Sequence, residues 1–369
     1  MTDFFGGGAL VSLRDHLLPG LWPLLIAFAV CALVAPLAIR LSRRTGLIAE
    51  PGGRHAHSNP TPLLGGLAMY AGFAAAVLIF LPGYAYTPGL LVVSGLAAGL
   101  LIIDDRHSMS PWVKLAVQVI LSLLAVVVFG VEITYVSLPG SHLVQLGLLV
   151  TPVSMFWLLG MQNTVNFLDG VDGLAAGVIF IVALILMLAA GELKDIEVVK
   201  LSGALAGTCA GFLLFNFHPA RIFMGDSGAH FLGIALGMIS ILGVAKVAVA
   251  FALAVPVIAL AVPIADTAWA ILRRRRSKTS VAEADLAHLH HRLQSFGLDP
   301  RQTCYVFYAA SGLLGALGLT LFGHGRILAV VLVAAAVLTS TVVADLLLHA
   351  GWSVPAPWLR RLLNAPGSR

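Results

Sequence analysis

Charged residues are scarce in this sequence. Only 11% of its 369 residues are Asp, Glu, Lys or Arg, whereas 59% are hydrophobic, and the mean hydropathy is +0.97. No polar stretch is long enough to fold as a separate domain. These values exclude a soluble globular protein of this length. They are typical of a polytopic helical membrane protein built as one domain over residues 1–369.

Three further features are missing. The three cysteines, Cys31, Cys209 and Cys304, have neither metal-ligand spacing nor an even number for a disulfide framework, so they are expected to pack as small hydrophobic residues. The apolar runs are continuous, which excludes the alternating strands of membrane barrels and favours an all-α fold. The first ~20 residues lack the pattern of a cleavable signal, so the first span is expected to remain in the mature protein.

Apolar runs of membrane-spanning length recur along the chain, at roughly 20 residues per span. They lie at about 20–39, 62–82, 88–103, 113–131, 144–160, 174–190, 198–215, 229–245, 247–272, 304–323 and 327–348. Only Lys246 separates the eighth and ninth runs, so the sequence predicts about 10–11 transmembrane helices. Pro256 and Pro263 predict a kink in the ninth.

Basic residues gather on one side of these spans. Of the 22 Lys and Arg residues, 17 fall in the connections after odd-numbered spans or in the C-terminal tail, and five fall on the other side. Because cytoplasmic loops are enriched in Lys and Arg, the first group is expected to face the cytoplasm. The predicted cytoplasmic loops are about 40–61, 104–112, 161–173, 216–228 and 273–303.

The predicted loop 161–173 carries polar residues at three-residue steps. Asn163, Asn166, Asp169 and Asp172 would form one stripe if the segment were helical. A polar stripe between membrane-length apolar runs is costly unless it lines a watery cleft. An ordinary polar loop joining two helices is the simpler interpretation of this patch taken alone.

Adjacent acids end the third span. Asp104 and Asp105 would point about 100° apart on a helix, which suits two different functions, such as a metal ligand beside a proton acceptor. A hydrated helix end with exposed acids is the alternative. Ser110 and Pro111 predict the N-cap and first position of the helix that follows.

The last predicted loop contains the segment His288-Leu-His-His-Arg-Leu293. Its histidines, His288, His290 and His291, lack the i, i+4 spacing of a helical metal pair. Imidazoles beside the guanidinium of Arg292 are better suited to gripping phosphate.

The predicted cytoplasmic face therefore holds a cluster of acids, which includes Asp226 in a glycine-flanked turn close to Asn216. Such acids would repel one another, and any anionic substrate, unless a hard divalent cation lay between them. Carboxylate and asparagine oxygens suit Mg²⁺, with Mn²⁺ as an alternative. Acids for the metal, with His and Arg for phosphate oxygens, make up the inventory of phosphoryl transfer.

Four ordered motifs resemble those of the polyprenyl-phosphate N-acetylhexosamine-1-phosphate transferases. They are Asp104-Asp105 with Ser110 and Lys114-Leu115, Asn163 to Leu174, Asn216 to Gly228, and His288 to Leu293. The segment Gly46 to Gly66 is similar to the family's first cytoplasmic loop, and the resemblance covers roughly residues 20–350. It implies a cytoplasm-facing active-site cleft in the bacterial inner (plasma) membrane, with no nucleic-acid partner, and a homodimer is one expected assembly.

The resemblance also implies a reaction. Undecaprenyl phosphate would attack the sugar-bearing phosphorus of a UDP-N-acetylhexosamine, so that UMP leaves and a lipid pyrophosphoryl sugar forms. Direct attack and a double displacement through an aspartyl intermediate would use the same residues, and both remain open.

By motif position, the resemblance assigns roles. Asp226 would be the principal Mg²⁺ ligand. Asp104 or Asp105 would be the base for the lipid phosphate, and the other would assist metal or charge placement. Asp169 and Asp172, with Asn166, would orient the nucleotide or the metal. The remaining substrate contacts would come from Lys114, Asn163, Asn216, His288, His290, His291 and Arg292.

The histidine segment resembles the branch of the family that uses UDP-N-acetylglucosamine, so transfer of GlcNAc-1-phosphate to start O-antigen, common-antigen or wall-glycopolymer synthesis is preferred. The muramoyl-pentapeptide transferases of peptidoglycan synthesis are the alternative. Ala229-His230 stands where the family usually has Ser-Leu, and Met109 replaces a leucine. His230 either alters the sugar or anion preference or is a tolerated substitution at a helix start.

Three other classes of membrane protein explain these polar loops less well. A cation-coupled transporter predicts acids near the bilayer midplane and often a repeat between halves, whereas these acids lie at span ends on one face. An intramembrane aspartyl protease would leave the third acidic loop and the histidines unused. A structural scaffold leaves every polar loop unexplained. Vesicle uptake, peptide cleavage and UMP release separate these possibilities.

Overall fold

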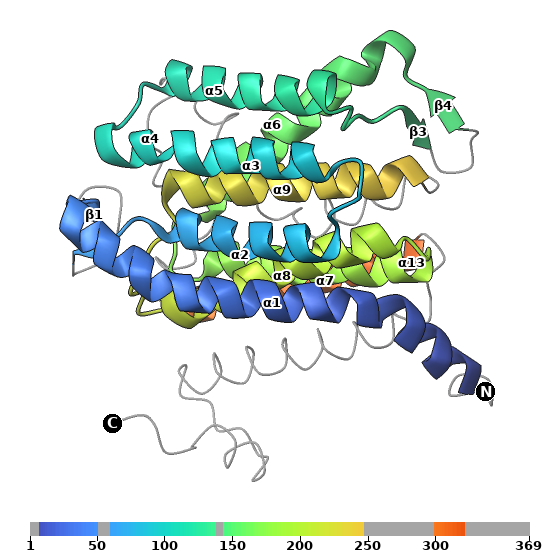
Figure 1. The fold of residues 1–369 in the computed structure, drawn as a ribbon, viewed down its shortest axis with the longest axis horizontal. Coiled ribbons are helices and arrows are strands. Elements are labelled where there is room, and N and C mark those ends of the chain that lie inside the picture. The colour runs from blue at the N-terminus through green and yellow to red at the C-terminus, as the bar shows by residue number, and fades with distance from the viewer. Residues whose placement is uncertain (1–6, 51–59, 138–142, 247–298, 322–369) are drawn as a thin grey trace.

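The computed structural model describes residues 7–50, 60–137, 143–246 and 299–321, which form a bundle of antiparallel helices (Figure 1). The helices are α1 (Gly7–Thr45), α2 (Gly65–Phe80), α3 (Thr87–Leu100), α4 (Ile102–His107), α5 (Pro111–Leu123), α6 (Val150–Leu168), α7 (Leu174–Glu192), α8 (Ile196–Asn216), α9 (Gly225–Lys246) and α13 (Pro300–Leu321). A π-helical turn, η1 (Leu124–Val128), extends α5, and a 3₁₀ turn, η2 (Gly147–Leu149), precedes α6. The strands form two antiparallel pairs, β1 (Ile48–Ala49) with β2 (Thr61–Pro62) and β3 (Tyr135–Ser137) with β4 (Leu143–Gln145).

Within the described part of the chain, seven helical stretches are long and apolar enough to cross a membrane. They are His16–Thr45, Thr87–His107, Pro111–Val128, Gly147–Leu168, Leu174–Glu192, Ile196–Asn216 and Gly225–Gly243, and Gly65–Phe80 is a shorter apolar helix. The prediction of an all-α polytopic membrane protein is confirmed. The predicted ninth span at 247–272 with its kink, and the eleventh span at 327–348, lie outside the described residues.

Helix α9 lies at the centre of the bundle. It packs against α3 and α6 on one side and against α2 on another, and every residue from Ser227 to Gly243 is buried (Figure 1). Helix α1 packs along α2 and α8 at the edge of the bundle (Figure 1). The first residues of α9 are therefore surrounded by the ends of several other helices.

The predicted polar loops meet at one end of the bundle. Phe223, in the loop after α8, donates its backbone N–H to the Pro62 carbonyl oxygen (2.8 Å), and its own carbonyl accepts from the Gly65 N–H (3.0 Å). The carboxylate of Asp105 accepts the N–H of Asp226 (2.7 Å). These contacts bring residues 62–65, 105 and 223–226 together at one end of the bundle, which we call the polar end. Most of the predicted loop 273–303 lies outside the described residues.

Two helices extend further into the predicted loops than expected. Helix α6 continues to Leu168, so Asn163 and Asn166 are helical and the predicted loop 161–173 shrinks to 169–173. Helix α9 begins at Gly225, which places Asp226 in its first turn. Asn166 and Asp226 bond to each other, and Asn163 bonds to Gln118 on α5. Because these polar side chains have partners on neighbouring helices, α6 and α9 extend beyond their apolar runs.

Three glycines spaced four residues apart bring α8 close to α1. A Cβ atom added to Gly203, Gly207 or Gly211 would lie 2.2, 2.0 or 2.6 Å from a backbone carbonyl oxygen of α1. Small residues at this spacing let membrane helices approach closely. The α1–α8 contact is therefore set by backbone packing.

Replacing Gly207 by Ala is expected to destabilise the fold by about 1–3 kcal/mol, because the Leu24 carbonyl oxygen belongs to a helix backbone that cannot give way locally. Thermal unfolding in detergent, followed by tryptophan fluorescence, measures this. Gly99→Ala is the matched control, since a Cβ there has no atom within 4 Å. Equal melting temperatures for the two variants would contradict the packing argument.

Candidate active site

The start of α5 is fixed as the sequence predicts. The Ser110 Oγ accepts a hydrogen bond from the Val113 N–H (3.4 Å), and Pro111 occupies the first helical position. The proline needs no N–H partner there, and the serine satisfies one of the free donors of the first turn. The prediction of this N-cap is confirmed. It places Lys114 on the first turn of α5, at the polar end.

Carboxylates from two other helices contact the ammonium group of Lys114 on α5. Its Nζ lies 3.0 Å from Asp104 Oδ2 on α4 and 2.6 Å from Asp226 Oδ2 on α9. Asn166 on α6 donates its side-chain amide to the other oxygen of Asp226. We call these four residues the Lys114 cluster. It contains one cation and two carboxylates, and its Lys114 and Asp226 side chains retain 19% and 31% exposure.

Asp105 faces a different partner from its neighbour Asp104. Its two carboxylate oxygens accept the backbone N–H groups of Asp226 (2.7 Å) and Ser227 (3.3 Å), at the positive end of the α9 dipole. Gly225, with φ +68°, precedes them, and a Cβ on it would lie 2.6 Å from the carboxylate. These contacts agree with the expectation that Asp104 and Asp105 have different functions. The role of Asp105 as a metal ligand stays a prediction.

Asp172 is hydrogen-bonded to the loop between α8 and α9. Its Oδ2 atom accepts the Ala220 N–H (3.0 Å) and lies 2.8 Å from His218 Nδ1. His218 was not among the predicted site residues, although it lies between Asn216 and Asp226 in the fourth motif. Its contact with Asp172 spans 46 residues of sequence, so no local pattern indicates it.

Asn216 is buried, and both the oxygen and the nitrogen of its side-chain amide are hydrogen-bonded to the main chain. Its Oδ1 accepts the Gly173 N–H (3.0 Å), and its Nδ2 donates to the Ile222 carbonyl oxygen (2.9 Å). The side chain thereby joins the loop 169–173 to the loop 217–224. These contacts give Asn216 a positioning role, and its direct contact with substrate stays a prediction.

Asp169 directly follows the last residue of α6, within electrostatic reach of three other acids. Burial raises the pKa of its carboxyl well above the usual range, and the nearby charges of Asp226, Asp105 and Asp172 raise it further. Both effects oppose ionisation. The expected role of Asp169 in orienting the nucleotide or the metal stays a prediction.

Helix α13 is hydrogen-bonded to the loops 169–173 and 217–224. Arg301 Nε donates to the His218 carbonyl oxygen (3.1 Å), and the Tyr308 hydroxyl donates to the Gly173 carbonyl oxygen (2.7 Å). The end of the predicted histidine loop is therefore held at the polar end. The predicted contact residues His288, His290, His291 and Arg292 lie outside the described residues.

The donor set of the Lys114 cluster fits a hard divalent cation. Among the described residues, no group of three or more His, Cys, Asp or Glu side chains is arranged to hold a metal. Mg²⁺, however, commonly takes one or two carboxylates and completes its shell with water and substrate phosphate. One oxygen each of Asp104 and Asp226 already lies within 3.0 Å of a single cationic nitrogen.

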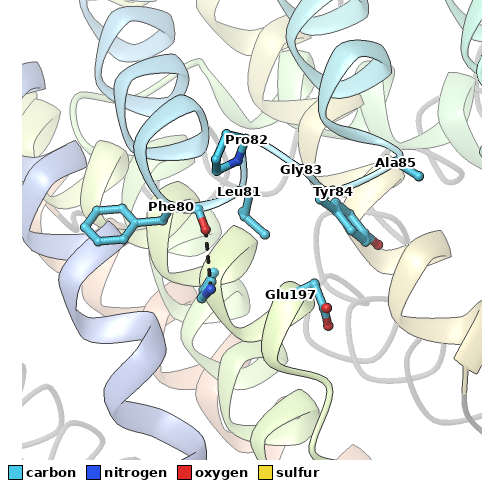
Figure 2. Close-up of a pocket in the computed structure, with 8 residues that line it drawn as sticks. Phe80, Leu81, Pro82, Gly83, Tyr84, Ala85 and Glu197 are labelled. Carbon is cyan, nitrogen blue, oxygen red and sulfur yellow. Dashed lines mark hydrogen bonds between the residues drawn. The ribbon is translucent and has the colours of Figure 1, made fainter.

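A shallow pocket of about 260 Å³ lies at the opposite end of the bundle, beside the turn between α2 and α3 (Figure 2). It is lined by residues 80–85 and by Glu197 and Lys200 of α8, and Lys200 Nζ donates to the Phe80 carbonyl oxygen (3.3 Å). The length of α2 and α8 separates this pocket from the Lys114 cluster (Figure 1). It is not part of the candidate active site.

Comparison with known proteins finds one matching family and relatives that are named as sugar-phosphate transferases. Residues 87–244 match the family described as Glycosyl transferase family 4. The chain is 34% identical over 294 residues, 77% of its length and 81% of the relative, to a Bacillus subtilis protein named "Probable undecaprenyl-phosphate N-acetylglucosaminyl 1-phosphate transferase". It is 36% identical over 368 residues (90% and 89%) to the decaprenyl-phosphate N-acetylglucosaminephosphotransferase of Mycolicibacterium smegmatis. It is 34% identical over 318 residues (81% and 97%) to the phospho-N-acetylmuramoyl-pentapeptide-transferase of Heliobacterium modesticaldum.

Proposed function

Since this chain belongs to the polyprenyl-phosphate N-acetylhexosamine-1-phosphate transferases of glycosyl transferase family 4, we propose that it transfers GlcNAc-1-phosphate from UDP-GlcNAc to undecaprenyl phosphate. The observation that carries the proposal is the convergence of Asp104, Lys114, Asn166 and Asp226 at the polar end. It brings two carboxylates of the kind that bind Mg²⁺ and a cation of the kind that binds phosphate to one point.

The proposed reaction exchanges one phosphorus–oxygen bond for another. An oxygen of the lipid phosphate attacks the sugar-bearing phosphorus of the donor. The bond from that phosphorus to the bridging oxygen breaks, and UMP leaves with the oxygen. The charge on the phosphoryl oxygens must be stabilised throughout, so catalysis depends on positioning and on cations.

The residues of the cluster take distinct roles in this proposal. Asp226 and Asp104 would hold Mg²⁺, which when bound neutralises charge on the donor diphosphate. Lys114 supplies a second cation to the phosphate oxygens. Either of the two adjacent acids could accept the proton of the lipid phosphate, because the carboxylates of both are already hydrogen-bonded. Both oxygens of Asp105 accept α9 backbone N–H groups. Asp104 Oδ1 accepts the Met109 N–H (2.6 Å), and its Oδ2 contacts Lys114. Asn166 orients Asp226.

The setting of the site supports a lipid acceptor. The cluster lies at the ends of membrane-length helices, where a phosphate head group at the membrane surface is within reach. We place the polar end at the cytoplasmic face of the inner membrane on the distribution of Lys and Arg. The product would then start an O-antigen, common-antigen or wall glycopolymer.

A muramoyl-pentapeptide transferase is the second candidate, because the relative of that name has the same 34% identity as the Bacillus subtilis relative. UMP release by the purified protein tests both. The assay contains Mg²⁺ and either undecaprenyl or decaprenyl phosphate, with UDP-GlcNAc, UDP-GalNAc and UDP-N-acetylmuramoyl-pentapeptide as separate donors.

Release with UDP-GlcNAc that stops on adding EDTA and returns with excess Mg²⁺ is the expected result. Release only with the pentapeptide donor would replace the first candidate by the second. No release with any donor, from protein that melts cooperatively, would contradict both, and uptake of substrates into sealed vesicles would then support the transporter alternative.

A further inference from the structure

A second polar layer lies one helical turn deeper in the bundle than the Lys114 cluster. It consists of Gln118 on α5, Asn163 on α6 and His230 on α9, which we call the inner layer. Each of its members is three or four residues from a member of the Lys114 cluster on the same helix, so the two share a helix face. The same three helices are therefore joined twice, once at the site and once beneath it.

The hydrogen bonds of the inner layer determine the tautomer of His230. Asn163 Nδ2 donates to the Leu159 carbonyl oxygen (2.8 Å) and to Gln118 Oε1 (2.9 Å). The Gln118 amide is thereby oriented with its Nε2 toward His230 Nε2, at 3.5 Å. Because an amide nitrogen only donates, the imidazole Nε2 accepts, and the proton of the neutral ring is on Nδ1.

The buried imidazole of His230 is less favourable for stability than an apolar side chain would be at the same position. His230 is 0% exposed and Gln118 is 2% exposed. The Nδ1 atom of His230 has no hydrogen-bond partner in the described part of the chain. A buried donor without a partner destabilises the fold, and an aliphatic side chain would avoid that cost. The bond with Gln118 is what the imidazole contributes that an aliphatic side chain cannot.

We propose that His230 is a positioning residue for the transfer reaction, acting through Gln118 to hold α5 against α9. Gln118 and Lys114 are one turn apart on α5, and His230 and Asp226 are one turn apart on α9. Fixing the deeper pair fixes the register of the two helices, and with it the 2.6 Å contact between Lys114 and Asp226. This inference rests on the proposed function, since its readout is UMP release.

The test compares His230→Leu with His230→Gln. Leucine fills the space without accepting a hydrogen bond, whereas glutamine carries an acceptor oxygen that can reach the Gln118 amide. His230→Leu is expected to lower kcat by about 10-fold or more, as for other partners that orient a site carboxylate. KM for UDP-GlcNAc should change little, because donor binding needs no contact with the inner layer. His230→Gln should recover most of the lost kcat.

A double-substitution cycle with Gln118→Leu separates positioning from packing. If the two residues act through their shared bond, the loss in the double variant is smaller than the product of the two single losses. Equal kcat for wild type and His230→Leu would overturn the proposal. So would independent losses in the cycle, or a His230→Gln variant as slow as His230→Leu.

Two controls keep the result interpretable. A wild-type protein that releases no UMP from any donor would contradict the proposed function, whereas an active wild type with an unaffected His230→Leu variant contradicts only the role of His230. If His230→Leu does not melt cooperatively, His230→Met takes its place as the apolar variant, and the same comparison with His230→Gln decides the proposal.

Discussion

Asp226→Asn is expected to lower the rate of UMP release by about 10³-fold or more, which corresponds to roughly 4 kcal/mol of transition-state stabilisation. The carboxylate of Asp226 is bound by Lys114 (2.6 Å) and by the Asn166 amide, so it lies at the centre of the Lys114 cluster. Asparagine keeps the size of the side chain but removes the negative charge that would hold Mg²⁺. The concentration of Mg²⁺ needed for half-maximal activity should rise in the same variant.

Asp195→Asn is the matched control for this substitution. Asp195 is buried, and its Oδ1 atom caps α8 by accepting the Val198 N–H (3.3 Å), at the end of the bundle opposite the site. Asparagine caps helices about as well as aspartate, so its activity and melting temperature should stay close to those of wild type. Near-wild-type turnover by Asp226→Asn would show that the metal and charge role assigned to Asp226 is wrong.

Lys114→Met is expected to lower UMP release by about 100-fold or more, because it removes the cation that we assign to the reacting phosphates. The substitution also leaves Asp104 and Asp226 without the ammonium that lies 3.0 and 2.6 Å from their oxygens. Methionine keeps most of the length of the side chain, so the packing of α5 should change little. Lys114→Arg should recover only part of the rate, since the planar guanidinium cannot occupy the same point between the two carboxylates.

A Mg²⁺ titration distinguishes two roles for Lys114. If the lysine binds substrate phosphate, Lys114→Met stays slow at every Mg²⁺ concentration, and this is the expected result. If it serves only as a counter-ion for the two carboxylates, saturating Mg²⁺ will restore the rate and contradict the phosphate role. Lys200→Met is the control, because Lys200 donates to the Phe80 carbonyl at the opposite end of the bundle and should not affect transfer.

The sequence by itself determined the class of the fold and the position of the chemistry. Continuous apolar runs can satisfy their backbone polar groups in a membrane only as helices. The positions and lengths of these runs were therefore enough to predict most of the described spans to within a few residues. The start of α5 was also predictable from the sequence. Ser110 caps the helix by accepting the N–H of a residue three positions later, and Pro111 takes the first helical position. The motifs that contain Asp104, Lys114, Asn166 and Asp226 pointed to one site, and the structure brings these residues together.

Only the tertiary structure decided how each side chain is used. Asp104 and Asp105 are neighbours in sequence, yet one binds Lys114 and the other the start of α9, 121 residues away. Asn216 turned out to join two loops through main-chain bonds. The inner layer was not predicted, since Gln118 and His230 lie 112 residues apart. Hydropathy and spacing act along one segment, whereas a hydrogen-bond partner on another helix is fixed only when the helices pack.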